Sequence, residues 1–118
     1  MEEITDLQKN CERLSDGICG YCKPLMLEKE DRKERTRLLS CEGDLLMCVQ
    51  YALEADTLQS CTDKLRLALE EAEIIRFTLG QTKHKNSDVL NLMELCSRIE
   101  KQLGNMIAEA ERKTEVKK

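Results

Sequence analysis

Hydrophobic residues recur at alternating intervals of three and four along most of the chain. This spacing keeps side chains on one face of an α-helix, so each series predicts a buried seam between helices. The first series comprises Ile4, Leu7, Cys11, Leu14, Ile18, Tyr21, Leu25, Leu39, Leu46, Val49 and Leu53, with charged residues at its centre. The second comprises Leu58, Cys61, Leu65, Ala68, Ala72, Ile75 and Leu79. The third comprises Val89, Leu92, Cys96, Ile99, Leu103, Met106 and Ala110.

Gly17, Gly20 and Pro24 divide the first series. Inside a helix, glycine costs about 1 kcal/mol and proline about 3 kcal/mol, whereas proline is well tolerated in a first turn. We therefore expect one helix over residues 3–16 and a second over residues 24–55. A continuous, kinked helix is the alternative, because the heptad phase persists across the gap.

Two further helices are expected over residues 57–79 and 88–112. The candidate capping residues are Asp56 or Thr57 for the first and Asn86 or Ser87 for the second. The short polar connection between these helices predicts an antiparallel C-terminal hairpin.

The predicted fold is therefore all-α: one domain over residues 1–118, built from long heptad-patterned helices in a helical bundle or coiled coil. Residues 45–58 are apolar on several faces, which favours a bundle of at least three helices over a two-stranded coiled coil. The second helix then has more apolar surface than one hairpin covers. The partner-binding residues predicted on it are Leu39, Leu46, Val49 and Leu53. Exchange of Leu46 for aspartate is expected to abolish association.

Composition argues against an enzyme and against several classes of partner. The chain has 118 residues, 41% hydrophobic and 36% charged, with no Trp, one Phe and two Tyr, which suits helix–helix seams better than a shaped pocket. A net charge of −4 with interspersed signs predicts no nucleic-acid partner. No apolar stretch approaches the roughly 18 residues of a membrane span, so no membrane partner is expected. The N-terminal residues show no signal peptide, and a cytoplasmic or nuclear location is expected.

Seven cysteines form an odd set without a secretory signal, which predicts free thiols in a reducing compartment. Cys19 and Cys22 have the Cys-x-x-Cys spacing of thiol–disulfide oxidoreductases and of half a zinc site. The redox motif normally follows a strand, and none is predicted here. The remaining ligands of a zinc site would have to come from Cys11, Cys41 or Cys48, since the single histidine, His84, lies far along the chain. We expect no cofactor and no metal, and keep a zinc- or redox-regulated module as an alternative.

Two short segments resemble the N-terminal four-helix bundle of the mixed-lineage kinase domain-like pseudokinases. The matching positions are Cys11, Arg13, Leu14, Gly20, Lys23, Pro24 and Leu25, together with residues 68–72, Ala-Leu-Glu-Glu-Ala. The stretch between them is longer here than in that family. The resemblance implies a four-helix bundle that acts at membranes, which we keep as a further alternative. The function expected from the residues themselves is a non-enzymatic scaffold or adaptor that binds a protein partner, or itself, through its apolar helix seams.

Overall fold

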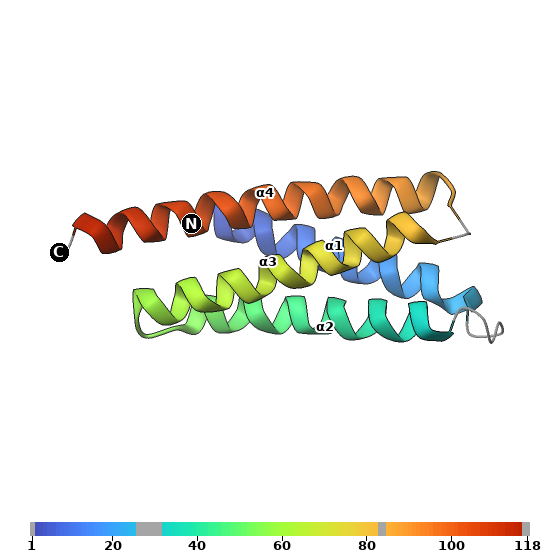
Figure 1. The fold of residues 1–118 in the computed structure, drawn as a ribbon, viewed down its shortest axis with the longest axis horizontal. Coiled ribbons are helices and arrows are strands. Elements are labelled where there is room, and N and C mark those ends of the chain that lie inside the picture. The colour runs from blue at the N-terminus through green and yellow to red at the C-terminus, as the bar shows by residue number, and fades with distance from the viewer. Residues whose placement is uncertain (1, 26–31, 83–84, 117–118) are drawn as a thin grey trace.

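Four segments form α-helices in the computed structural model, which describes residues 2–25, 32–82 and 85–116 (Figure 1). Helix α1 spans Glu2–Leu25, α2 Arg32–Glu54, α3 Leu58–Gln81 and α4 Ser87–Val116. No strand occurs in these ranges, so the predicted all-α fold is confirmed. The bundle is elongated, with extents of 54 × 21 × 21 Å.

Each helix packs against two others, in a closed ring of four contacts: α1 with α2, α2 with α3, α3 with α4, and α4 with α1. Following the colour from blue to red in Figure 1, the chain passes along the bundle and back twice. This arrangement gives each helix an inner face toward the core, two flanks toward its neighbours and one outer face.

The inner faces of α3 and α4 carry most of the residues that the second and third hydrophobic series predict to be buried. On α3, Leu65, Ala68, Ala72, Ile75 and Leu79 are at most 2% exposed. On α4, Val89, Cys96, Ile99 and Leu103 are completely buried. Small residues such as the two alanines let neighbouring helices approach closely. The predicted burial is therefore correct for most of both series, whereas Leu58, Cys61 and Met106 are only half-buried.

Helix α1 does not end near Asp16, as the sequence suggested, but continues through Gly17 and Gly20 to Leu25. The cost of the two glycines is offset by packing, because the buried side chains of Leu14, Ile18 and Cys22 continue along the same face of the helix. Gly17 also has a packing role. A methyl group at this position would meet the Cδ2 atom of Leu92 on α4, so the end of the Leu92 side chain would have to shift to accommodate it. Of the expected helix over 24–55, residues 24 and 25 belong to α1, residues 26–31 lie outside the described residues, and Arg32–Glu54 form α2.

The hydrophobic phase carried from α1 into α2 was also wrong by one residue. The buried positions on α2 are Leu38, Cys41, Leu45, Val49 and Ala52. Of the predicted seam, Val49 is among them, whereas Leu39, Leu46 and Leu53 each follow directly after a buried residue. Because α1 and α2 are separate helices, the phase of one places no constraint on the other. The core of α2 therefore follows its own series of three- and four-residue intervals.

Side-chain hydrogen bonds fix the helix ends and tie the helices together. The hydroxyl of Thr57 accepts a hydrogen bond from the Ser60 amide at 3.0 Å, and Asn86 Oδ1 accepts one from the Val89 amide at 2.9 Å. These are the caps of α3 and α4, and both were among the predicted candidates. Half-buried Tyr21 donates to Glu34 Oε1 at 3.0 Å and also pairs with the hydroxyl of Thr82, so its ring connects α1, α2 and the end of α3.

Two further glycines, Gly43 on α2 and Gly104 on α4, occupy helical backbone with open space where a side chain would lie. Exchange of either for alanine is expected to stabilise the bundle by about 1 kcal/mol, because alanine has less conformational freedom to lose. The midpoint of thermal unfolding, followed by circular dichroism, should rise by roughly 4 °C. Gly17→Ala is the matched control and should lack this gain, because its methyl group meets Leu92.

Candidate functional site

The four residues predicted to bind a partner occupy three different environments on α2. Val49 is 3% exposed and belongs to the core of this bundle. Leu46 and Leu53 are half-buried and pack against that core from the side. Leu39 is 37% exposed. The structure therefore does not bring the four side chains together on one outer surface, and Leu39 has the most accessible side chain of the four.

Leu39 lies at a groove between α1 and α2 that also contains both cysteines of the Cys-x-x-Cys motif. The groove has a volume of about 430 Å³ and is lined by Cys19, Cys22, Lys23, Arg35, Thr36 and Leu39. Cys19 is exposed, whereas Cys22 is 2% exposed and faces the core. The cysteine pair thus lies beside Leu39, one of the residues predicted to bind a partner.

The environment of this cysteine pair disfavours thiolate chemistry. Both residues lie near the C-terminal end of α1, where the helix dipole stabilises cations and not anions. Burial, with further contributions from Cys19 and Glu34, raises the pKa of Cys22 to about 11. A redox-active pair needs the opposite shift, toward a stable thiolate at neutral pH.

Alkylation should therefore distinguish the two thiols. At pH 8 in the native protein, iodoacetamide is expected to modify exposed Cys19 at least about 10-fold faster than Cys22, because only the thiolate reacts. Peptide mapping by mass spectrometry gives the rate at each site. Equal rates at Cys19 and Cys22, or a faster rate at Cys22, would contradict the packing described here. Cys19→Ser provides the control for the assignment of the fast phase.

Among the described residues, no three His, Cys, Asp or Glu side chains are grouped so that they could hold a metal ion. His84 lies outside the described residues. Within those same ranges, no helix contains a stretch long and apolar enough to cross a membrane.

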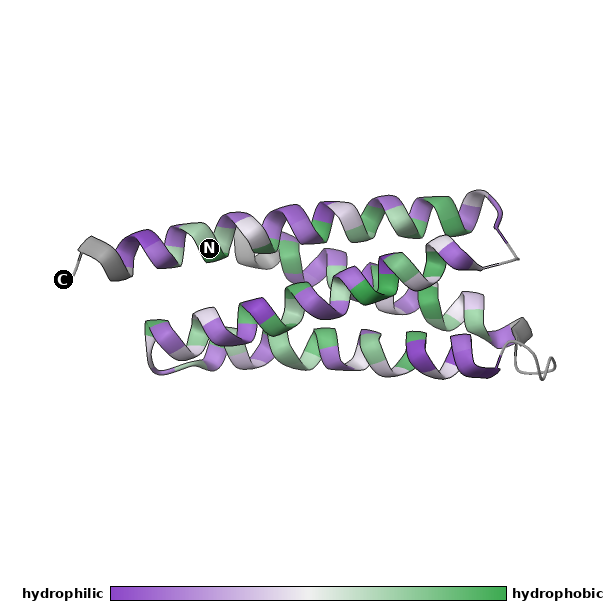
Figure 2. Ribbon diagram, viewed as in Figure 1, coloured by the Kyte–Doolittle hydropathy of each residue, from purple (hydrophilic) through white to green (hydrophobic). Residues whose placement is uncertain are grey.

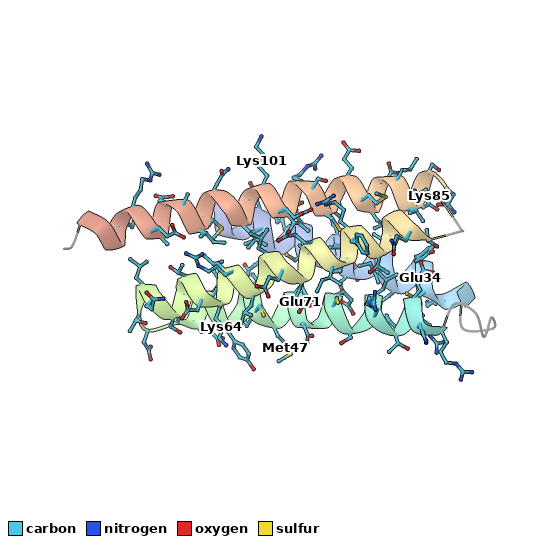
Figure 3. All side chains as sticks on the ribbon, viewed as in Figure 1. Glu34, Met47, Lys64, Glu71, Lys85 and Lys101 are labelled. Atoms are coloured by element: carbon cyan, nitrogen blue, oxygen red, sulfur yellow. The ribbon has the colours of Figure 1, made fainter. Side chains whose placement is uncertain are left out.

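A second surface, which the sequence reasoning missed, lies on the outer side of α2 and α3. Across the described residues, the large hydrophobic side chains that remain exposed are Leu39, Met47, Tyr51, Leu67, Ile74, Phe77 and Leu90. Six of these seven belong to α2 and α3. Phe77 is 60% exposed and Met47 is 52% exposed, and Figure 3 shows Met47 pointing away from the bundle. We call the outer surface formed by Met47 and Tyr51 of α2 and Leu67, Ile74 and Phe77 of α3 the α2/α3 face.

Side chains from both helices meet on this face. Near one end, Arg37 of α2 lines a shallow groove of about 600 Å³ together with Glu73, Ile74, Arg76 and Phe77 of α3. Near the other end, the Lys64 ammonium lies over the Tyr51 ring at 5.6 Å from its centroid, a cation–π contact. The apolar side chains are thus framed by charged groups, as at the rim of many protein interfaces.

Glu71 lies between α2 and α3, at the inner edge of the α2/α3 face (Figure 3). Burial and a hydrogen bond with Glu71 raise the pKa of the Cys41 thiol to about 12. This thiol therefore stays protonated and can donate to the carboxylate. On the opposite flank of α3, Arg76 makes two hydrogen bonds to Glu100 of α4, at 2.6 and 3.1 Å. Contacts with both neighbours fix the orientation of α3 and hence of its outer side chains.

Comparison with known proteins supports the fold. No family model matches the sequence, and no curated protein is significantly similar to it. One solved structure is similar: a protein of unknown function from the S23 ribosomal protein family of Bacteroides thetaiotaomicron. The superposition has a TM-score of 0.82 and covers 90% of this chain and 98% of the other, with 17% sequence identity. At this identity the similarity shows a shared fold and no more.

Proposed function

We propose that this chain is a non-enzymatic interaction module that binds an α-helix of a protein partner, or of another copy of itself, on its α2/α3 face. The observation that carries the proposal is that five of the seven large hydrophobic residues exposed among the described residues lie on this face. Contiguous exposed apolar surface of this kind is typical of protein-binding sites. The cysteine pair, with its buried and protonated Cys22, supports no comparable chemistry.

The outer surface of α3 has the pattern expected of a helix-binding seam. Leu67, Glu70, Ile74 and Phe77 follow one another at intervals of three, four and three residues, which places them in one stripe along the helix. Three of these four side chains are large and apolar, and each is at least 40% exposed. A partner helix laid along this stripe would pack its own apolar residues between them.

The finer architecture expected from the sequence belongs to the same proposal. We propose that the inner seams pack like a coiled coil and that α3 and α4 form a C-terminal hairpin. Both features would keep the α2/α3 face rigid. Rigidity matters because a preformed surface loses little conformational entropy when a partner binds. The arginine–glutamate pairs between α3 and α4, Arg66 with Glu111 and Arg76 with Glu100, support this role.

A selection from a displayed library of amphipathic helical peptides tests the proposal without knowledge of the natural partner. We expect peptides with dissociation constants in the range of about 1–100 μM for the wild-type chain. Binding should be lost in Ile74→Glu, on the α2/α3 face, and retained in Leu90→Glu, at a more exposed position on α4. Failure to recover any peptide that distinguishes these two variants would refute the proposal.

A further inference from the structure

The charges on the α2/α3 face are separated along its length. At the end where α2 begins, Arg32, Lys33 and Arg37 are all exposed. This end of α2 is visibly hydrophilic in Figure 2. Toward the other end, where α2 finishes and α3 begins, the exposed charged residues include Glu54, Asp56 and Asp63. The apolar side chains of the face lie between a basic and an acidic end.

The polarity is not cancelled by the other charges nearby. Near the basic end, Arg76 adds a cation, although it is paired with Glu100, and Glu73 is an exposed acid. Near the acidic end, Lys64 makes its cation–π contact with the Tyr51 ring, and Arg66 forms an ion pair with Glu111. Two more exposed carboxylates, Asp44 and Glu70, lie closer to the middle. A partner that fits this face must therefore present acidic groups at one end and basic groups at the other.

A second copy of the chain meets this requirement when it is reversed. A two-fold axis lying in the plane of the face and perpendicular to the helices places the basic end of each copy on the acidic end of the other. Both ends are then neutralised at once, and the apolar side chains of the two copies face each other. A parallel arrangement would instead place Arg32, Lys33 and Arg37 opposite the same residues of the second copy.

The size of the face suits such a contact. Helices α2 and α3 have 23 and 24 residues, which corresponds to a length of about 35 Å. With a width of 21 Å, the face covers roughly 700 Å², close to the approximately 800 Å² that each partner contributes to a standard protein interface.

We infer that the α2/α3 face binds a second copy of this chain in antiparallel orientation, with the charged ends of the two faces paired. This inference rests on the proposed function and specifies its partner. It makes the assembly a symmetric dimer in which α2 and α3 of both copies form the interface.

Charge exchange tests the inference. The basic-end variant carries Lys33→Glu and Arg37→Glu, and the acidic-end variant carries Glu54→Lys and Asp63→Lys. The chain has a mass of 13.6 kDa. By light scattering coupled to size-exclusion chromatography, we expect the wild type to have twice this mass and each variant to dimerise at least about 10-fold more weakly at low salt. An equimolar mixture of the two variants should recover the dimer, because every contact between unlike chains is again attractive.

Three outcomes would overturn the inference. A wild-type chain that stays monomeric at about 100 μM, a concentration at which micromolar association is complete, excludes the second copy. A dimer that persists unchanged in both single-end variants, or two variants that do not combine when mixed, excludes the antiparallel pairing. Circular dichroism confirms that each variant is folded. A monomeric wild type that still binds the selected helical peptides would refute this inference alone and leave the proposed function intact.

Discussion

Exchange of Phe77 for glutamate is expected to weaken binding at the α2/α3 face by at least about 100-fold, with the bundle still folded. The Phe77 ring is 60% exposed in the isolated chain, so it contributes little to the core. In a complex, its burial is worth roughly 1.5–3 kcal/mol, and a carboxylate in its place would have to be desolvated without a partner. Together these effects exceed about 2.8 kcal/mol, which corresponds to a factor of 100 in the dissociation constant. Sedimentation equilibrium, or titration calorimetry with a selected peptide, measures the loss.

Leu90→Glu is the matched control for this experiment. Leu90 is 55% exposed but belongs to α4, so its exchange should change the dissociation constant by less than a factor of about 3. Equal losses in both variants would mean that binding depends on general surface hydrophobicity, and no loss in Phe77→Glu would remove the α2/α3 face as the site. Leu46→Asp, the exchange that the sequence alone suggested, is less informative. Leu46 is half-buried against the core, so aspartate there should destabilise the bundle as well.

The inner face of each helix was predictable where an uninterrupted hydrophobic series ran through it. The series on α3 and α4 contain no charged residue, and their central members, such as Ala68, Ile75 and Ile99, are completely buried. The capping roles of Thr57 and Asn86 were predictable for a related reason, since short polar side chains satisfy amide groups that a helix start leaves unpaired.

Features that depend on contacts between helices were not predictable in this way. Gly17 looks like a helix breaker in the sequence, but its effect is decided by Leu92, which approaches it from α4. On α2, two series one residue apart compete, and only the packing against α1 and α3 selects Leu38 and Leu45 over Leu39 and Leu46. A local pattern cannot resolve such a choice, because both series satisfy the helical period.

The α2/α3 face was not predicted either, but for a different reason. Its members on α3 were visible as a series of their own, since Leu67, Ile74 and Phe77 are separated by seven and three residues. A second, longer series on the same helix, from Leu65 to Leu79, forms the core, so the outer series is not needed to explain the fold. A helix with two apolar stripes needs two partners. The core takes up one of them, and the other stripe stays exposed in the isolated chain.

Raising the pH from 8 to 10 is expected to lower the free energy of unfolding, and Cys11 and Cys96 together should account for roughly 2–3 kcal/mol of this loss. Both thiols are at most 1% exposed. Burial is the main cause that raises the pKa of each to about 12 from an ordinary value of 9.0, and a neighbouring carboxylate contributes, Glu12 for Cys11 and Glu100 for Cys96. In the unfolded chain these thiols lose their protons near pH 9, whereas in the bundle they keep them. Their contribution to stability is therefore complete below pH 9 and declines as the pH rises toward 12.

Urea denaturation between pH 7 and 10 measures this decline, and two variants assign it. In Cys11→Ala/Cys96→Ala, the fall in stability with pH should be shallower than in the wild type, even though the missing sulfur atoms lower stability at every pH. In Ile99→Val, which makes a cavity in the core without removing a thiol, the slope should match that of the wild type. The slope is the informative quantity, because a cavity shifts the whole curve by a constant amount while a titrating thiol changes its shape. An unchanged slope in the double variant would assign the alkaline loss to groups other than these two core thiols.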